Sequence, residues 1–194
     1  MVMSERKQQI LEHAAELVAT VGFDSFSYHD LSERLGITKA SLHHHYPKKE
    51  DLGLSLLDLM ITFKEQKRDE LLQKADTPLK RLDAYFTFYR EICSDGQCSQ
   101  ICPISSLQAE INVIPQSMRD KLQVLDKIET HMVTELLTQG RDMGEMTFAG
   151  EPSHQAVMLI SAIKGVLQFS RSHGIEVVDN TIKQLKFTLG LHPD

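Results

Sequence analysis

The stretch of residues 27–52, SYHDLSERLGITKASLHHHYPKKEDL, constrains the fold of this chain more than any other. Leu31 and Leu35 are spaced four residues apart, so both lie on one face of a short helix. Gly36 follows at once and suits the left-handed C-cap that ends a helix. Thr38 can then cap a second short helix. Helix, glycine-containing turn and helix is the sequence pattern of a helix-turn-helix.

The second short helix, over residues 39–45, is predicted to bury Leu42 and to turn its polar side chains outward. A row of long, short and flat polar side chains is a surface that the major groove of DNA accepts. The residues predicted to contact DNA are Ser27, Thr38, Lys39, Ser41, His43, His44 and Lys49.

The run GITKASLHHHYPKKEDL closely resembles the signature of TetR-type transcriptional regulators. Tyr46 matches the aromatic residue that closes the recognition helix of that family, and KKEDL matches the start of the following helix. The upstream run ILEHAAELVATVGFDSFSYHDLSERLG is similar to the family's first two helices, so the resemblance covers roughly residues 5–55. His43 departs from the pattern, because the family usually has a tyrosine there.

This resemblance implies an all-α protein with two domains. Residues 1–47 would form a three-helix DNA-binding domain that contains the helix-turn-helix, and residues 48–194 a helical domain for signal sensing and dimerisation. It also implies a homodimeric repressor that binds a palindromic, double-stranded operator and is released from it by a small signal.

The charge distribution agrees with a specific rather than a general DNA binder. The formal net charge is −6, which argues against a generally basic nucleic-acid binder. Lys39, Lys48 and Lys49 nevertheless form a local positive patch. No apolar run is long enough to span a membrane, and the N-terminus lacks the apolar region of a signal peptide. We therefore expect a cytoplasmic protein with no membrane partner.

Apolar periodicity predicts helices along the rest of the chain. They are expected over residues 4–21, 48–72, 79–92, 103–111, 115–139 and 153–172, with a last helix capped by Asp179 or Asn180.

The helix over residues 153–172 is almost free of charge and is therefore expected to be buried on several sides. It could lie in the core of one chain, or it could pair with the last helix and their copies as an intersubunit four-helix bundle. We favour the second interpretation, because a reader of a two-fold-symmetric operator needs a matching dimer. The predicted interface residues are Ala156, Leu159, Ile160, Ile163, Leu167, Ile182 and Leu185.

Three cysteines are present, and their odd count in a reducing compartment argues against a structural disulfide framework. Their spacing does not match a zinc site, so Cys93 and Cys98 are expected to be inert. Cys102 precedes Pro103 and thus lies at a predicted helix N-terminus, where the dipole lowers the pKa of a thiol. The runs CPISSLQAEI, MRDKL and FAGEP resemble the branch of the TetR family that senses electrophiles and oxidants. In that branch a cysteine matching Cys102 carries the sensing chemistry; a structural role for it remains open.

Aromatic and methionine side chains recur at helical spacing in the C-terminal part of the chain. Such stripes form plain core or line a ligand pocket, and regulators of this architecture keep a cavity between these helices. The candidate pocket residues are Tyr85, Phe86, Tyr89, Met118, Met132 and Phe169.

No metal, cofactor or enzymatic activity is predicted. His43, His44 and His45 are consecutive, so their side chains point roughly 100° apart and cannot converge on one ion. No catalytic or phosphate-binding motif is present. The main alternative is a regulator that responds to a reversible ligand without cysteine chemistry. A remote one is a helical enzyme or binding protein for a small hydrophobic or electrophilic compound.

Overall fold

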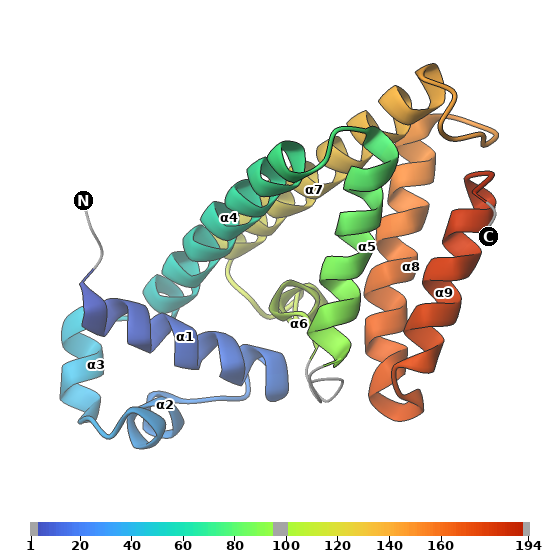
Figure 1. Ribbon diagram of the computed structural model, residues 1–194. Coiled ribbons are helices and arrows are strands. Elements are labelled where there is room, and N and C mark those ends of the chain that lie inside the picture. Colours follow the sequence, from blue (N-terminus) through green and yellow to red (C-terminus); the bar gives the residue numbers. More distant parts are fainter. Residues whose placement is uncertain (1–3, 95–100, 192–194) are drawn as a thin grey trace. The chain divides into compact units, whose positions relative to one another are not determined.

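The computed structural model describes residues 4–94 and 101–191, and all regular secondary structure within those ranges is helical (Figure 1). This confirms the predicted all-α class. The helices are α1 (Glu5–Thr20), α2 (Tyr28–Leu35), α3 (Lys39–His45), α4 (Lys49–Lys74), α5 (Pro78–Ser94), α6 (Pro103–Ala109), α7 (Gln116–Asp142), α8 (Pro152–His173) and α9 (Glu176–Thr188).

The chain divides into two compact units. The first comprises residues 1–63 and 101–125, and the second comprises residues 64–100 and 126–194. The first unit therefore extends past residue 47 and includes a second stretch of the chain. The reason is that Leu52 and Leu56 from the start of α4 are fully buried in the core of the first unit. The beginning of α7 contributes Met118 to the same core.

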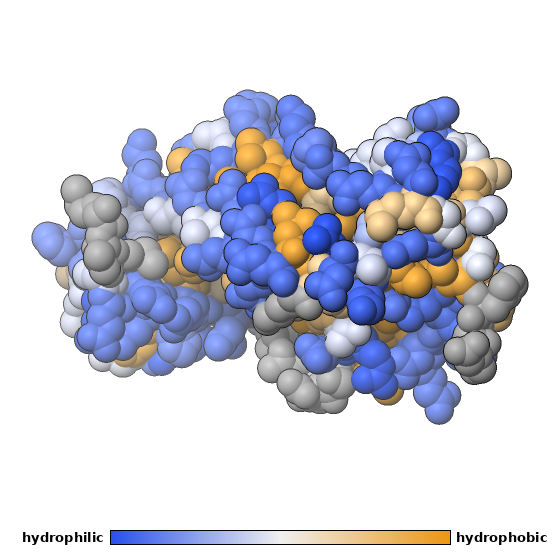
Figure 2. All heavy atoms as spheres, turned by 45° about the horizontal axis from the view of Figure 1, so that its top comes forward, coloured by the Kyte–Doolittle hydropathy of each residue, from blue (hydrophilic) through white to orange (hydrophobic). Residues whose placement is uncertain are grey.

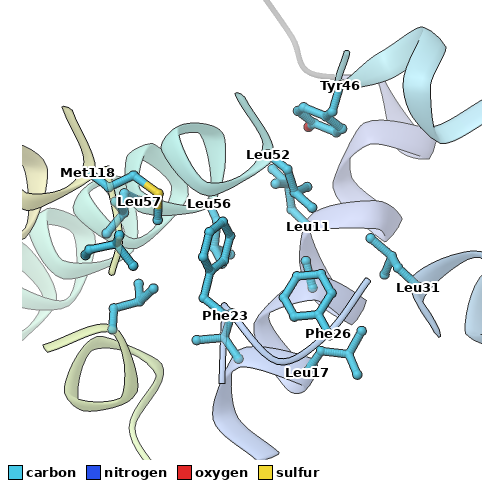
Figure 3. Packing of buried hydrophobic residues seen from close by; sticks show 14 of the residues in the cluster. Leu11, Leu17, Phe23, Phe26, Leu31, Tyr46, Leu52, Leu56, Leu57 and Met118 are labelled. Carbon is cyan, nitrogen blue, oxygen red and sulfur yellow. The ribbon is translucent and has the colours of Figure 1, made fainter. Parts of the chain in front are cut away.

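The core of the first unit surrounds two phenylalanine rings (Figure 3). Phe23 and Phe26 follow α1 and pack edge to face, with ring centroids 5.8 Å apart. Helix α1 presents Leu11 and Leu17 to this core, and both are almost completely buried. Burying one such apolar side chain contributes roughly 1.5–3 kcal/mol, so this cluster fixes α1 and α2 relative to α4.

The second unit is a helical bundle in which α8 lies beside α9 (Figure 1). Its core contains the aromatic face of α5, which includes the buried side chains of Tyr85, Phe86 and Tyr89. Helix α9 begins at Glu176, so the predicted cap at Asp179 or Asn180 is wrong. Val178 is completely buried, and its packing stabilises a helix that begins before the two residues that capping preference favoured.

Hydrophilic side chains cover most of the face shown in Figure 2, with smaller hydrophobic patches between them. In the described part of the chain, no helix combines the length and the apolar character that crossing a membrane requires.

Candidate DNA interface and sensing residues

Local hydrogen bonds fix the helix-turn-helix in the first unit. The Ser27 hydroxyl accepts from the backbone N–H of His29 at 3.2 Å, and the Asp30 carboxylate accepts from the backbone N–H of Ser27 at 2.7 Å. The backbone N–H of Ser27, and then the Ser27 hydroxyl, which donates to the same carboxylate at 2.8 Å, hold the pKa of Asp30 below its usual range. Gly36 ends α2 with φ 60°, a left-handed conformation that suits glycine. The predicted start and end of α2 are confirmed.

Helix α3 is anchored to the unit at both ends. The Thr38 hydroxyl accepts from the backbone N–H of Ser41 at 3.2 Å, and Leu42 is buried. Beyond the helix, the Tyr28 hydroxyl donates to the backbone carbonyl of Tyr46 at 2.8 Å. Burial, followed by the charge of Asp51, raises the pKa of Tyr28 to about 12. The hydroxyl therefore remains a hydrogen-bond donor at every physiological pH.

The structure separates the predicted DNA contacts into two groups. Thr38, Lys39, His43 and His44 are exposed and Ser41 is partly exposed, so these residues offer an accessible polar surface on α3. The hydroxyl of Ser27 instead serves as the cap of α2.

Lys49 belongs to this second group. Its ammonium donates to the carbonyl oxygens of Asp24 and Phe26, and it lies 4.9 Å and 4.4 Å from the ring centroids of Phe23 and Phe26. Burial lowers its pKa, and nearby carboxylates, first that of Asp24, oppose this effect. Lys49 thus holds the connection between α1 and α2, which explains a cation in the first turn of α4.

Sequence reasoning missed Glu110, which binds the same connection from the end of α6. Its carboxylate accepts the backbone N–H groups of Phe23 at 2.8 Å and Asp24 at 3.1 Å. Gly22 has φ 93°, and a Cβ at that position would collide with this carboxylate. Because Glu110 is far from these residues in the sequence, no local pattern pairs them.

Cys102 is the N-cap residue of α6, as expected, and is a partly exposed free thiol. The segment around it is tied to the end of α1. The Ile101 N–H donates to the carbonyl of Ala19 at 3.2 Å, and the buried Ser106 hydroxyl donates to that of Val18 at 2.7 Å. A displacement at the start of α6 would therefore act on α1.

The expectation against a structural disulfide framework is wrong for Cys93. This residue is buried and disulfide-bonded, and its sulfur lies 3.3 Å from the Ser170 hydroxyl oxygen. The odd number of cysteines argues against a set in which every cysteine is paired, but it does not exclude a single disulfide bond. Cys98 lies outside the described residues.

The six candidate pocket residues do not form a single lining. Tyr85 and Tyr89 lie together, with ring centroids 5.0 Å apart, and Phe86 is buried beside them. Met132 packs against the same core, whereas Met118 belongs to the first unit. Phe169 is exposed and stacks on His173.

The two tyrosines instead converge on a buried carboxylate that the sequence analysis did not single out. Oε1 of Glu129 accepts from the Tyr85 hydroxyl at 3.1 Å and from the Tyr89 hydroxyl at 2.5 Å. Its Oε2 lies 2.6 Å from Nζ of Lys64 and 3.5 Å from Nζ of Lys164. Burial opposes ionisation, but the two lysines outweigh it and lower the pKa of Glu129.

The residues predicted to form the dimer interface point mainly into the second unit itself. Six of the seven are buried within one chain (Ala156, Leu159, Ile160, Ile163, Leu167 and Leu185), and Ile182 is partly buried. Outside this buried face, α8 leaves large apolar side chains uncovered within one chain. The exposed fractions are 52% for Val157, 41% for Met158 and 54% for Phe169.

Two protein-family models match the chain. Residues 10–56 match the model described as "Bacterial regulatory proteins, tetR family". Residues 78–183 match "Tetracyclin repressor-like, C-terminal domain", and this second match alone covers more than half of the chain.

Curated relatives and solved structures agree with these matches. The HTH-type transcriptional repressor NemR of Escherichia coli K12 is 25% identical over 94% of this chain and 92% of its own length. The repressor KstR2 of Mycolicibacterium smegmatis is 23% identical over 71% of this chain and 65% of its own length.

Among solved structures, a TetR family regulator from Agrobacterium tumefaciens has a TM-score of 0.88 and 27% identity, covering 94% of this chain and 96% of its own. The reduced form of E. coli NemR has a TM-score of 0.82 and 23% identity, covering 96% and 98%. Together with the exposed recognition helix, the matches show that this chain belongs to the TetR family of bacterial transcriptional regulators.

Proposed function

We propose that the chain is a homodimeric, cytoplasmic repressor that reads a palindromic operator with α3 and releases it on a small chemical signal. The single observation that carries this proposal is the exposed polar face of α3 on a helix anchored by Thr38 and Tyr46. Two copies related by a two-fold axis would place two such helices in successive major grooves. We assign no enzymatic activity to it.

Selection of duplexes from a random-core DNA library by the purified protein tests this function and supplies the operator.

On the selected duplex, Lys39→Ala is expected to weaken binding to all sequences and to reduce the salt slope of the binding constant by about one per neutralised phosphate. Lys49→Ala is expected to leave the salt slope unchanged and to lower the free energy of unfolding by about 1–2 kcal/mol, because its ammonium binds within the unit. Fluorescence anisotropy at several salt concentrations, with thermal unfolding, separates the two effects. A reduced salt slope in a fully stable Lys49→Ala variant would instead assign the phosphate contact to Lys49.

For the dimer, we propose that two copies associate through the outward face of α8 together with α9. The support is the uncovered apolar surface of Val157, Met158 and Phe169, while most of the interface residues that the sequence pattern indicates are buried in the core of one chain. An apolar surface of this kind on a soluble chain commonly marks an association site.

Phe169→Glu is expected to raise the dissociation constant of the dimer at least about tenfold, because a charge would be buried without a partner. Ile163→Glu places the charge in the core of one chain, so we expect it to misfold. Lys127→Glu, at an exposed position on α7, serves as the control. Sedimentation equilibrium measures the association, and a Phe169→Glu protein that dimerises like the control would refute this interface.

For the signal, we propose oxidation or alkylation of Cys102. Its position at the start of α6, the contacts of α6 with α1 and the similarity to the NemR repressor support this assignment. A reversible ligand in the second unit is the second candidate, favoured by the buried polar cluster around Glu129.

A further inference from the structure

The imidazole of His43 is held in one orientation at the end of the exposed face of α3. Its Nδ1 lies 3.2 Å from the carbonyl oxygen of Pro47. Its ring packs against that of Tyr28, with centroids 4.8 Å apart. Tyr28 is in turn fixed by its hydrogen bond to Tyr46. The ring of His43 is therefore positioned by α2 and by the chain that follows α3.

This position determines which nitrogen carries a hydrogen. A carbonyl oxygen only accepts, so the contact with Pro47 requires a hydrogen on Nδ1 of His43. In the neutral ring Nε2 then carries a lone pair and no hydrogen. A phosphate oxygen is also an acceptor, so the neutral ring has nothing to donate to it. Protonation gives Nε2 both an N–H group and a share of a positive charge, and a phosphate binds both.

The protonation of His43 depends on the solvent and on the DNA, because the neighbouring groups of the protein do not stabilise a charged ring. Tyr28 on α2 stays neutral, because its pKa is raised to about 12 by burial and then by Asp51 of α4. Lys39 lies one turn earlier on the exposed side of α3 and is cationic. Within the described residues, no carboxylate forms an ion pair with the ring.

The neighbouring histidines differ from His43. His45 packs against His44 with ring centroids 5.5 Å apart. Burial, and then the charges of His44, Lys7 and Arg6, lower the pKa of His45. His45 therefore resists protonation. His44 is exposed, and among the described residues no carbonyl oxygen holds a hydrogen on its ring.

We infer that operator binding takes up a solvent proton at Nε2 of His43, so that the affinity for DNA rises as the pH falls through neutrality. This inference rests on the proposed DNA-binding function. His43 lies in the last turn of α3, and that end of a recognition helix approaches the DNA backbone. One proton would be taken up by each protomer, two by the dimer. The repressor would hold its operator more tightly in an acidified cell.

The test measures the affinity of the full-length protein for its selected duplex at about pH 6 and about pH 8 by fluorescence anisotropy. For the wild type we expect about tenfold or more tighter binding at the lower pH. The salt slope should also be steeper there by about two, because two further phosphates are neutralised per dimer. A purely structural role of His43 would not change the salt slope with pH.

His43→Gln cannot titrate, and His43→Tyr keeps a flat ring with a donor at both pH values. Both are expected to bind with nearly equal affinity and salt slope at the two pH values, whereas the control His44→Gln should keep the pH dependence. Thermal unfolding at each pH verifies that the variants are folded. Equal affinity and slope for the wild type at both pH values would overturn the inference, as would an unchanged pH dependence in His43→Gln and His43→Tyr. Failure to select any duplex would instead contradict the proposed function.

Discussion

Glu129→Ala is expected to lower the free energy of unfolding by about 3 kcal/mol or more, because it removes the centre of a buried charge cluster. The Glu129 side chain is only 2% exposed, and those of Lys64 and Lys164 are 15% and 17% exposed. Without the carboxylate, two ammonium groups face each other in a poorly solvated site, and the hydroxyls of Tyr85 and Tyr89 lose their acceptor. Chemical denaturation with far-UV circular dichroism measures the change.

Glu135→Ala is a matched control on the same helix. Glu135 is 56% exposed and pairs with the exposed His131, so its loss should cost less than about 0.5 kcal/mol. Similar losses of stability in the two variants would show that the cluster contributes nothing beyond an ordinary surface pair.

The same cluster determines how stability depends on pH. The folded chain lowers the pKa of Glu129, so its contribution is present above the pKa in the unfolded chain and is lost as the pH falls through the folded value. Stability should therefore fall below about pH 4 in the wild type. In Glu129→Gln this part of the acid sensitivity should be absent.

The sequence predicted the helix-turn-helix well because its determinants are local. The cap of α2 at Ser27, the turn at Gly36 and the cap of α3 at Thr38 each act within a few residues. Such signals are visible in one sequence, and tertiary packing did not override them.

The clusters around Glu129 and Lys49 could not be predicted in the same way. Glu129 meets side chains from α4, α5 and α8, and only the packing of four helices brings these together. One signal was present: Glu129 occupies the apolar stripe of α7 between Leu125 and Met132, where a carboxylate needs partners. The sequence pattern predicts a DNA contact for Lys49, because a lysine that binds within its own chain cannot be distinguished in sequence from one that binds a phosphate.

The dimer assignment shows a different limit. An apolar helix face predicts burial but does not say whether the same chain or a second copy covers it. In α8, the residues chosen for the interface include Leu159 and Ile163, which are completely buried in one chain. The apolar residues left uncovered, such as Met158 and Phe169, occupy the opposite face.

Cys102→Ser is expected to bind the operator normally but to remain bound when N-ethylmaleimide is added, whereas the wild type should lose more than about a hundredfold in affinity. The thiolate is the reactive form of cysteine; its sulfur adds to the maleimide double bond, and the adjacent carbon takes a proton from water. The adduct adds bulk beside Pro103, at the start of α6.

The first unit offers a direct route from this adduct to the DNA-reading helices. Helix α6 is joined to α1 through Ser106 and Val18, and to the connection between α1 and α2 through Glu110. A displaced α6 would therefore move the helices that support α3. The two recognition helices of a dimer must stay about 34 Å apart to fit both half-sites. A shift that costs the DNA-bound state only about 3 kcal/mol is sufficient for a hundredfold loss.

The other described cysteine provides the matched control for this prediction. Cys93→Ser removes a buried, disulfide-bonded sulfur that N-ethylmaleimide does not alkylate and frees the thiol of its partner. The variant should still be released through Cys102, and the mass spectrum distinguishes an adduct on the freed thiol from one on Cys102. Anisotropy titrations of wild type, Cys102→Ser and Cys93→Ser on one duplex, with mass spectrometry to locate the adduct, measure the response. Release of Cys102→Ser by the same dose as the wild type would exclude Cys102 as the sensor. A reversible ligand that binds in the second unit would then become the leading explanation, because the buried Glu129 cluster would offer such a ligand polar partners.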